Sequence, residues 1–249
     1  MTAKNPLKAL WDFIAEPLLT LGLVFISTTA IAQPFYVPSG SMQPTIAIGD
    51  AMIGNKFAYG WSRWSVPFGL GPASDRRLLG RLPARGDVVI FRKPGDLGTT
   101  LVKRVIGLPG DRIQMREGLL YINEVPVKLE AAGMGSAESE SGGTEPARRF
   151  IETLPNGVRH PILKLRQYGV LDDTAVYTVP AGHLFMMGDN RDNSTDSRVP
   201  QAEGGPGFVP MVNLMAKAEV TIGSYDFLNA KGPATWPGLI RFERFFRSI

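Results

Sequence analysis

Three short stretches of the chain carry the side chains that hydrolysis of a peptide bond requires. They are residues 38–42 (Pro-Ser-Gly-Ser-Met), 103–111 (Lys-Arg-Val-Ile-Gly-Leu-Pro-Gly-Asp) and 188–198 (Gly-Asp-Asn-Arg-Asp-Asn-Ser-Thr-Asp-Ser-Arg). A serine hydroxyl attacks a carbonyl group only when a positioned base takes its proton. The first stretch supplies a serine, the second a lysine that can act as this base, and the third a polar loop that can hold both.

Lysine is the better candidate for the base, because the chain has only two histidines. His160 lies close to a loose polar stretch and His183 lies in a turn, and neither has a companion motif. A free lysine has a pKa of about 10.4, and burial among apolar side chains lowers that value by several units. Lys103, between Val102 and Val105, is expected to face inward from such a buried strand.

Two other lysines and one simpler interpretation compete with this assignment. Lys93 lies in an Arg-Lys-Pro sequence, a basic and turn-like setting that favours the charged amine, and Lys56 has no evident partner. Lys103 could also be a strand-edge lysine that points to water, as most lysines do. The local chemistry alone leaves these alternatives open.

The serine-containing turn and the polar loop also have ordinary interpretations, since both are typical turn compositions. A tight turn would, however, let Ser41 project, with its N–H and the Ser39 hydroxyl available to the oxyanion of a tetrahedral intermediate. The polar loop follows an apolar strand directly and is therefore expected near the core. Buried polar side chains need partners: Asp196 can pair with Arg198, and Ser194 can orient the lysine amine.

Strands are expected to position these residues. Segments rich in β-branched and apolar residues, bounded by Gly and Pro, predict strands at 87–91, 100–106, 112–115, 119–122, 175–179, 184–187 and 217–222. Residues 131–147, mostly Gly, Ser, Glu and Ala, have little to bury and predict a mobile loop. The fold class is therefore expected to be mostly β, and 126–170 an insertion, because strands resume on both sides of it.

The segment before the serine predicts a membrane anchor. Residues 17–32 carry no charge but are short of the roughly 20 residues that span a bilayer, so the span is expected to continue to about Val37. A cleaved signal peptide and a buried core helix are the alternatives. Lys4 and Lys8 precede the segment and no Lys or Arg follows before Lys56, which places the N-terminus in the cytoplasm and the rest of the chain outside.

Composition argues against several function classes. Without cysteine, the chain has no thiolate nucleophile, cysteine-based zinc site or disulfide framework. Two histidines and no carboxylate-rich loop argue against a metal centre, and the net charge of +4 comes from scattered basic residues, which argues against nucleic-acid binding. We therefore expect no metal, no cofactor and no nucleic-acid partner.

The motifs together resemble the bacterial type I signal peptidases, membrane-anchored serine proteases that remove signal peptides from exported preproteins. The resemblance rests on residues 39–45, 85–89, 103–111 and 188–198, which occur in the family's order behind an N-terminal anchor. It implies a Ser–Lys dyad without histidine, and an antiparallel β catalytic core with a smaller inserted β region behind one transmembrane helix. Some family members carry two spans where this chain has room for one, and nothing is carried over onto the insertion.

The resemblance also implies roles for individual residues. Ser41 is the nucleophile, Lys103 is the general base, and Ser39 and Ser41 form the oxyanion hole. The loop residues that support the lysine are Ser194, Asp196 and Arg198. Signal peptides carry small side chains before the cut, which implies shallow apolar pockets. The expected walls, all of which could equally be core residues, are Phe35, Val37, Met42, Val102, Met186 and Met187.

Location and partners follow from the same resemblance. The expected partners are secretory preproteins and the lipid bilayer, and the expected place is the bacterial inner membrane, crossed once, with the catalytic domain on the periplasmic side. The aromatic stretch 57–64 is expected at the membrane surface, or alternatively as a cap on the core. Residues 239–249 predict a short amphipathic helix with a basic face that packs on the protein or lies on the membrane.

The expected organisation has five parts. They are a cytoplasmic tip and anchor (1–34), the first part of the catalytic core (35–125), an insertion with a flexible loop (126–170), the second part of the core (171–222) and a C-terminal segment with the amphipathic helix (223–249). Two other function classes stay open. A self-cleaving transcriptional regulator would carry a DNA-binding module in place of the anchor, and a non-catalytic membrane-anchored scaffold would need neither Ser41 nor Lys103.

Overall fold

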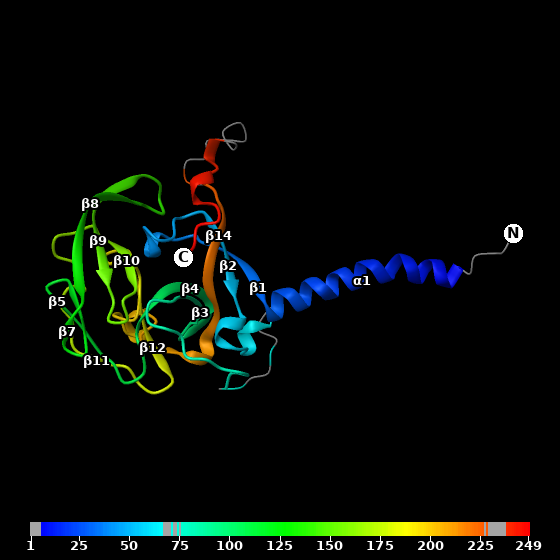
Figure 1. Ribbon diagram of the computed structural model, residues 1–249, viewed down its shortest axis with the longest axis horizontal. Helices are drawn as coiled ribbons and strands as arrows, with labels where there is room; N and C mark the ends of the chain where they lie inside the picture. The colour runs from blue at the N-terminus through cyan, green and yellow to red at the C-terminus, as the bar shows by residue number, and fades with distance from the viewer. Residues whose placement is uncertain (1–5, 67–70, 72–73, 75, 227, 229–237) are drawn as a thin grey trace.

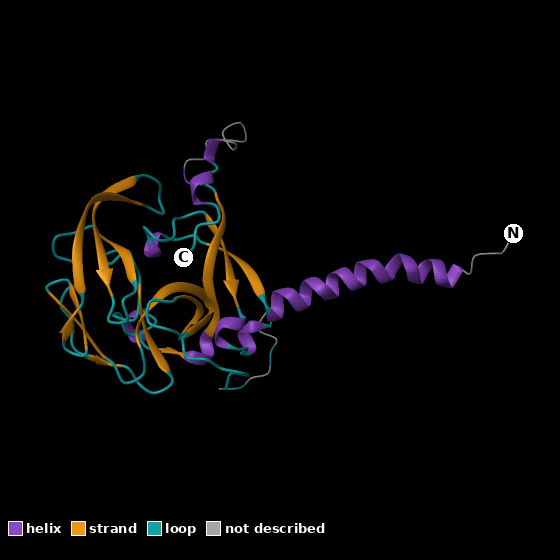
Figure 2. Ribbon diagram, in the orientation of Figure 1, coloured by secondary structure: helices purple, strands orange, loops and turns teal. Residues whose placement is uncertain are grey.

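A computed structural model describes residues 6–66, 71, 74, 76–226, 228 and 238–249. Helix α1 (Pro6–Ala30) extends away from a rounded body built of strands and loops (Figure 1). Within the described residues the body has only short helical turns besides these strands (Figure 2). The expectation of a mostly β, antiparallel fold is confirmed.

A seven-stranded antiparallel sheet forms the centre of the body, in the order β1-β2-β14-β3-β4-β12-β13. Four of the strands predicted from the sequence, at 87–91, 100–106, 184–187 and 217–222, belong to this sheet. Its strands are β1 (Ala32–Tyr36), β2 (Asp50–Asn55), β3 (Val88–Lys93), β4 (Asp96–Gly107), β12 (His183–Met187), β13 (Val209–Pro210) and β14 (Leu214–Ser224). The sheet therefore brings the serine turn after β1, the lysine on β4 and the polar loop after β12 to one region.

A four-stranded sheet in the order β11-β5-β6-β7 packs beside β12. It contains β5 (Arg112–Arg116), β6 (Leu119–Ile122), β7 (Val125–Pro126) and β11 (Tyr177–Thr178). Glu117 and Gly118 join β5 to β6 with positive φ values of 51° and 77°, as a two-residue hairpin turn requires. The hairpin predicted around these two residues is confirmed.

The inserted region forms a third sheet, in the order β10-β9-β8. Its strands are β8 (Lys128–Glu138), β9 (Thr144–Thr153) and β10 (Arg159–Lys164). The prediction of a mobile loop at 131–147 was wrong, because all but the tip of that stretch pairs as a hairpin. Small residues do the packing there: Ala137 and Ala147 are buried against Leu163, a contact that a count of large apolar residues does not reveal.

The segment between α1 and the serine turn is a strand and not part of a membrane span. Residues Ala32–Tyr36 form β1 and pair with β2, for example Phe35 opposite Met52. The expected continuation of a span to Val37 was therefore wrong. Among the described residues, no helix combines the length and the hydropathy needed to cross a bilayer. Lys4, on which the orientation argument partly depended, lies outside the described residues.

The last described segment does not form the expected amphipathic helix. Residues 238–249 contain no α-helix and only short 3₁₀ turns, one of them at Phe242–Arg244. The arginines that were expected to make a basic face turn toward the body instead. Arg241 pairs with Glu138 at 2.8 Å and Arg244 pairs with Asp50 at 2.6 Å. These two ion pairs hold the segment against β2 of the central sheet and the end of β8 in the inserted sheet.

Candidate active site

Ser41 and Lys103 meet in the structure. Ser41 lies in the 3₁₀ turn Gly40–Met42 that follows β1, and Lys103 lies where β4 enters the core. Lys103 Nζ is hydrogen-bonded to Ser41 Oγ. Both residues are buried, with exposed fractions of 2% for Lys103 and 8% for Ser41. The two residues that the sequence singles out as nucleophile and base are therefore in direct contact.

The surroundings of Lys103 favour its neutral form. Burial lowers the pKa of Lys103 to about 8, from 10.5. Asp196 and Asp189 act in the opposite direction, but each is itself paired with an arginine. A lysine with a pKa near 8 is neutral in a substantial fraction of molecules at neutral to mildly alkaline pH, as a general base must be.

The rival bases lie elsewhere. Lys56 is fully buried and burial lowers its pKa to about 8, but its Nζ donates to the Ser65 carbonyl oxygen at 2.6 Å. Lys93 lies at the end of β3, on the hairpin that leads to β4. Within the described residues, only Lys103 has a hydrogen bond to Ser41 Oγ. This contact separates Lys103 from the other two lysines, which local sequence could not do.

The expected oxyanion hole also has its parts in place. Ser39 Oγ lies 3.5 Å from Ser41 Oγ. In the turn Gly40–Met42 the first N–H that donates within the turn is that of Gln43, to the Gly40 carbonyl. The Ser41 N–H lies before it, and N–H groups at the start of a helix have no acceptor within the helix. Both serines line the same cavities. A negative oxygen that forms beside Ser41 Oγ can therefore meet one hydroxyl and one free N–H.

The backbone of the polar loop fixes the serine turn. Asn190 donates its N–H to the Ser41 carbonyl at 3.1 Å and its side-chain amide to the Gly40 carbonyl at 3.3 Å. Gly188 lies so close that a Cβ there would be 2.5 Å from the Ser41 carbonyl oxygen and 2.3 Å from Ser194 Oγ. No side chain fits at Gly188 unless the nucleophile turn or Ser194 moves.

Within this loop, one of the two expected supports is confirmed. Arg198 forms a two-pronged ion pair with Asp196, with both N–O distances 2.8 Å, and Asp196 also accepts from the Gly188 N–H at 3.0 Å. Burial would raise the pKa of Asp196, but this pair outweighs it and lowers the value. Ser194 is buried beside Asp196, yet its hydroxyl has no hydrogen bond to Lys103 in the described residues. The expected bond from Ser194 to the lysine is therefore absent.

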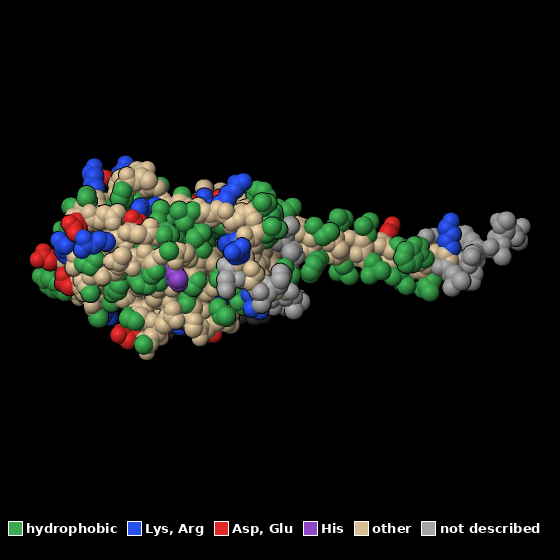
Figure 3. Space-filling view, turned by 90° about the horizontal axis from the view of Figure 1, so that it is seen from below, with side chains coloured by type: hydrophobic (Ala, Val, Ile, Leu, Met, Phe, Trp, Pro, Cys, Tyr) green, Lys and Arg blue, Asp and Glu red, His purple; other side chains and the backbone are tan. Residues whose placement is uncertain are grey.

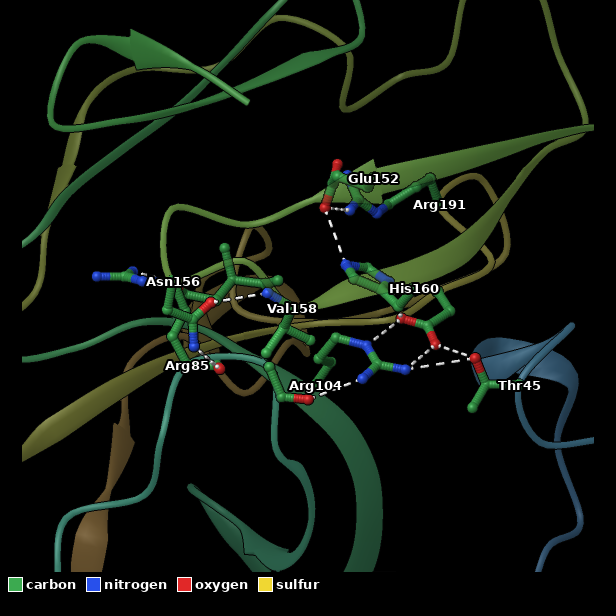
Figure 4. A network of polar contacts seen from close by, with 11 residues as sticks. Thr45, Arg85, Arg104, Glu152, Asn156, Val158, His160 and Arg191 are labelled. Atoms are coloured by element: carbon green, nitrogen blue, oxygen red, sulfur yellow. Dashed lines mark hydrogen bonds and ion pairs between the residues drawn. The ribbon is translucent and has the colours of Figure 1, made fainter. Parts of the chain in front are cut away.

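A second buried network, which sequence reasoning missed, begins at Arg104 next to the base (Figure 4). Arg104 binds both oxygens of Asp189, at 2.8 and 2.6 Å, and donates to the Gly86 carbonyl at 2.7 Å. Thr45, just beyond the serine turn, donates to the same carboxylate. Burial opposes ionisation of Asp189, but Arg104 and His160 outweigh it and hold the pKa of Asp189 well below its usual range.

His160 continues this network into the inserted sheet. Its Nδ1 lies 3.3 Å from Asp189 and its Nε2 lies 3.2 Å from Glu152, which Arg191 binds at 2.6 Å. Neither imidazole contact is aligned as a hydrogen bond, so both are ion-pair contacts. Burial lowers the pKa of His160, but the two carboxylates outweigh it and the pKa is raised. His160 and Glu152 are opposite each other across the β9–β10 pair, and recognition of that hairpin would have revealed them.

The inserted sheet also holds the polar loop through its backbone and a lysine. Leu163 on β10 donates to the Asp189 carbonyl at 2.9 Å and accepts from the Arg191 N–H at 3.0 Å. Lys164, the next residue, forms ion pairs with Asp192 and Asp172. The insertion is thus a wall of the site, although the sequence assigned it no role.

An apolar cavity of about 350 Å³ opens from the dyad toward β1. Four of the six expected pocket residues line it, namely Phe35, Val37, Met42 and Val102. Met186 and Met187 do not; their exposed fractions are 0% and 1%, and they pack into two different hydrophobic clusters. The assignment of these two methionines to the pocket was wrong, because successive residues of β12 point into the core on either side of the strand.

Comparison with known proteins identifies the family. Residues 10–222 match the family described as signal peptidase, peptidase S26. The chain belongs to this family. Its relatives include the signal peptidase I of Rickettsia conorii, 39% identical over 88% of this chain and 85% of the relative, and that of Rickettsia bellii, 35% identical over 93% and 83%. A crystal structure of a signal peptidase I from Enterococcus faecalis matches 55% of this chain and 97% of that chain at 25% identity, with a TM-score of 0.31. The protein is therefore a serine peptidase of this family.

Proposed function

We propose that this peptidase removes signal peptides from exported preproteins, with Ser41 as nucleophile and Lys103 as general base. The observation that carries the proposal is the hydrogen bond between Ser41 Oγ and a buried lysine whose pKa is lowered. The names of the relatives, signal peptidase I, supply the substrate class. A non-catalytic scaffold would not need this pair, and a self-cleaving regulator is disfavoured by the family match over residues 10–222.

The first half of the reaction forms an acyl-enzyme. Neutral Lys103 takes the proton of Ser41 as Oγ attacks the carbonyl carbon of the scissile bond. The Ser41 N–H and the Ser39 hydroxyl stabilise the oxyanion of the tetrahedral intermediate. When the intermediate collapses, the C–N bond breaks and the Lys103 ammonium gives its proton to the leaving amine. The signal peptide is then an ester of Ser41, and Lys103 is neutral again.

The second half releases the signal peptide. Lys103 takes a proton from a water molecule as the water attacks the ester carbon. The same oxyanion contacts hold the new tetrahedral intermediate, and its collapse returns the proton from Lys103 to Ser41 Oγ. Each step thus uses one amine as base and then as acid, which a lysine can do only if its pKa lies near the working pH.

The apolar cavity beside β1 fits the expected substrate. Small side chains need a shallow space lined by apolar groups, and the cavity of about 350 Å³ combines Phe35, Val37, Met42 and Val102 with the two dyad residues. In the described sheet β1 pairs with β2 on one side only, so an extended peptide could add to its other edge. We propose that the last residues of the signal peptide bind here.

We further propose that α1 anchors the enzyme in the inner membrane with the body on the periplasmic side. Apolar side chains are exposed along the helix (Figure 3), including Leu19, Leu23 and Ile26 at 59–65% exposure. Phe57 is half exposed near the base of α1, and Trp61 packs edge-on against it. Trp64 packs instead against the core cluster around Met42, so Phe57 and Trp61 are the better candidates for membrane contact.

The dyad is tested by preprotein cleavage with purified variants in detergent. Ser41→Ala and Lys103→Ala are each expected to abolish cleavage, and the double variant is expected to be no worse, because residues that act as a unit have non-additive effects. Lys93→Ala is the matched control and is expected to keep wild-type activity. Near-normal turnover by Lys103→Ala, with loss in Lys93→Ala, would disprove the assignment of the base.

The anchor is tested by extraction of membranes at alkaline pH. The full chain is expected to stay with the lipid, and a chain that begins at residue 32 is expected to be released. Full release of the intact chain would contradict the anchor and leave the dyad untouched.

A further inference from the structure

A second cavity reaches the dyad beside the apolar one. It measures about 590 Å³ and shares Ser39, Ser41, Leu101 and Lys103 with the apolar cavity. From these shared residues it extends toward the insertion and the polar loop, where Arg166, Val170, Asn193 and Thr195 line it. The two cavities therefore form one cleft with the nucleophile in its middle.

Acyl transfer requires space on both sides of the nucleophile. Ser41 attacks the carbonyl carbon between the signal peptide and the mature chain, so the two halves of the substrate leave that atom in different directions. The apolar cavity suits small apolar side chains, whereas the larger one combines apolar walls with more polar and charged groups, such as Glu140, Arg166 and Asn193. The first residues of a mature secreted chain are destined for water and fit the polar side better.

The arrangement of the fold supports the same placement of the signal half and the mature half of the substrate. The apolar cavity lies along β1, which follows α1, while the larger cavity lies toward the sheet of β8, β9 and β10 at the far end of the body (Figure 1). If α1 marks the membrane side, a signal peptide enters from that side. The mature chain then continues away from the membrane, across the inserted sheet.

Three exposed charged side chains line this cavity without an ion pair among the described residues: the carboxylates Glu140 and Glu203, and one cation, Arg166. Arg191 is buried and paired with Glu152, whereas the guanidinium of Arg166 is exposed and forms no ion pair among the described residues. Only the backbone of Arg166 is held, by its N–H to Asp192 at 2.9 Å and its carbonyl from Arg148 at 3.0 Å. The backbone is thus fixed while the charge faces the cavity, as recognition of a passing peptide requires.

We infer that this second cavity binds the first residues of the mature chain and that Arg166 is a specificity-determining residue, favouring an acidic over a basic side chain at the one position that lies next to it and away from Glu140 and Glu203. The inference rests on the proposed function of the dyad. It gives the inserted region a role in substrate selection in addition to its support of the polar loop.

The test uses peptides with one signal half and different leaving halves, cleaved by the full-length enzyme in detergent. A fluorogenic amide has no mature residues, and further substrates carry one, three or five. We expect kcat/KM to rise at least about fivefold with length, because contacts remote from the reacting bond contribute to transition-state binding. Cleavage of all substrates at the same kcat/KM would overturn the inference and leave the proposed function intact. Cleavage of none of them would overturn both.

A charge exchange tests the role of Arg166. With five mature residues, Arg166→Glu is expected to change the preference for acidic over basic side chains by about threefold to tenfold, the sum of one lost attraction and one new repulsion at an exposed site. The fluorogenic amide should be cleaved at the wild-type rate. Arg159→Glu is the control, since it makes the same charge change at an exposed arginine of the insertion outside this cavity, where Arg159 pairs with Glu130. Equal preferences in the two variants would contradict the role of Arg166.

Discussion

Lys103 and Arg104 are neighbours on β4, yet the structure treats their charges in opposite ways. Lys103 meets a serine hydroxyl and no carboxylate within hydrogen-bonding distance, and burial lowers its pKa to about 8. Arg104 is just as buried but binds both oxygens of Asp189, and its pKa is raised. Successive strand residues face opposite sides, so the sheet separates a proton-accepting side from a charge-holding side within one residue step.

This difference shows that burial alone does not decide protonation in this enzyme. Asp189 and Asp196 both lie near Lys103, but each is already neutralised by its own arginine. The lysine therefore experiences mainly desolvation, which disfavours its charged form. The charged networks on both sides of Lys103 thus keep these carboxylates from pairing with its amine.

The largest expected effect comes from a base that cannot lose its proton. Lys103→Arg keeps the positive charge and much of the volume, but a guanidinium stays protonated at any working pH. We expect kcat for preprotein cleavage to fall by at least about 10²–10⁴-fold, the usual contribution of a positioned general base. Activity within tenfold of wild type would show that proton transfer by residue 103 is not required.

Loss of the Asp189 carboxylate, which neutralises Arg104, is expected to lower the free energy of unfolding. Asp189→Asn leaves Arg104 buried without its counter-ion, and breaking a buried pair in this way costs about 3–5 kcal/mol. Chemical denaturation in detergent measures the loss. Glu130→Gln removes the carboxylate of an exposed pair with Arg159 and is expected to cost less than about 1 kcal/mol. Equal losses in the two variants would contradict the description of this network.

The lowered pKa of Lys103 should itself reduce the stability of the folded protein. This pKa is 10.5 in the unfolded chain and about 8 in the folded one, so the unfolded state binds more protons between these values and stability rises with pH across that window. A difference of about 2.5 corresponds to about 3 kcal/mol. Lys103→Met is thus expected to be inactive but more stable than wild type at pH 7. This advantage should shrink as the pH approaches 10.5, and a constant difference would exclude a proton-linked cause.

Replacement of His160 is expected to have the smallest effect on stability, and its pH dependence should have the opposite sign to that of Lys103. The pKa of His160 is raised in the folded state, so its stabilising contribution is complete below the unfolded value of about 6.5 and is lost as the pH rises through the folded value. His160→Gln is therefore expected to be destabilised more at pH 6 than at pH 9. Because Lys103 is unchanged in both proteins, its own pH dependence cancels. A difference that grows with pH would show that the imidazole is neutral in the folded enzyme.

Local chemistry narrowed the candidates for the Ser41–Lys103 pair, and the combined motifs were needed to prefer Lys103 over Lys56 and Lys93. The chain has no cysteine, its histidines have no adjacent motif, and Lys103 has an apolar neighbourhood that can be read locally. Strands with large apolar residues could be predicted because their pattern is also local in the sequence. The charged network could not be found in this way, since Asp189, Glu152 and Arg104 come together only when the central sheet and the inserted sheet have formed and packed.

The errors have a common physical cause. At 131–147 and at 239–249 the sequence was judged by what its side chains could bury, while the structure uses other interactions. Backbone pairing and two alanines order the hairpin, and Arg241 and Arg244 are recruited by distant carboxylates. Short-range patterns contain no information about partners a hundred residues away.

The ion pair between Arg241 and Glu138 also bears on the order in which the contacts of the serine turn form during synthesis of the chain. Glu138 contacts Gln43 in the serine turn, through its N–H at 3.0 Å, and Arg241 holds Glu138 from the other side. During synthesis the nucleophile emerges early, but this brace arrives only after almost 200 further residues have been joined. A nascent chain therefore carries the serine long before it carries this support for the serine turn.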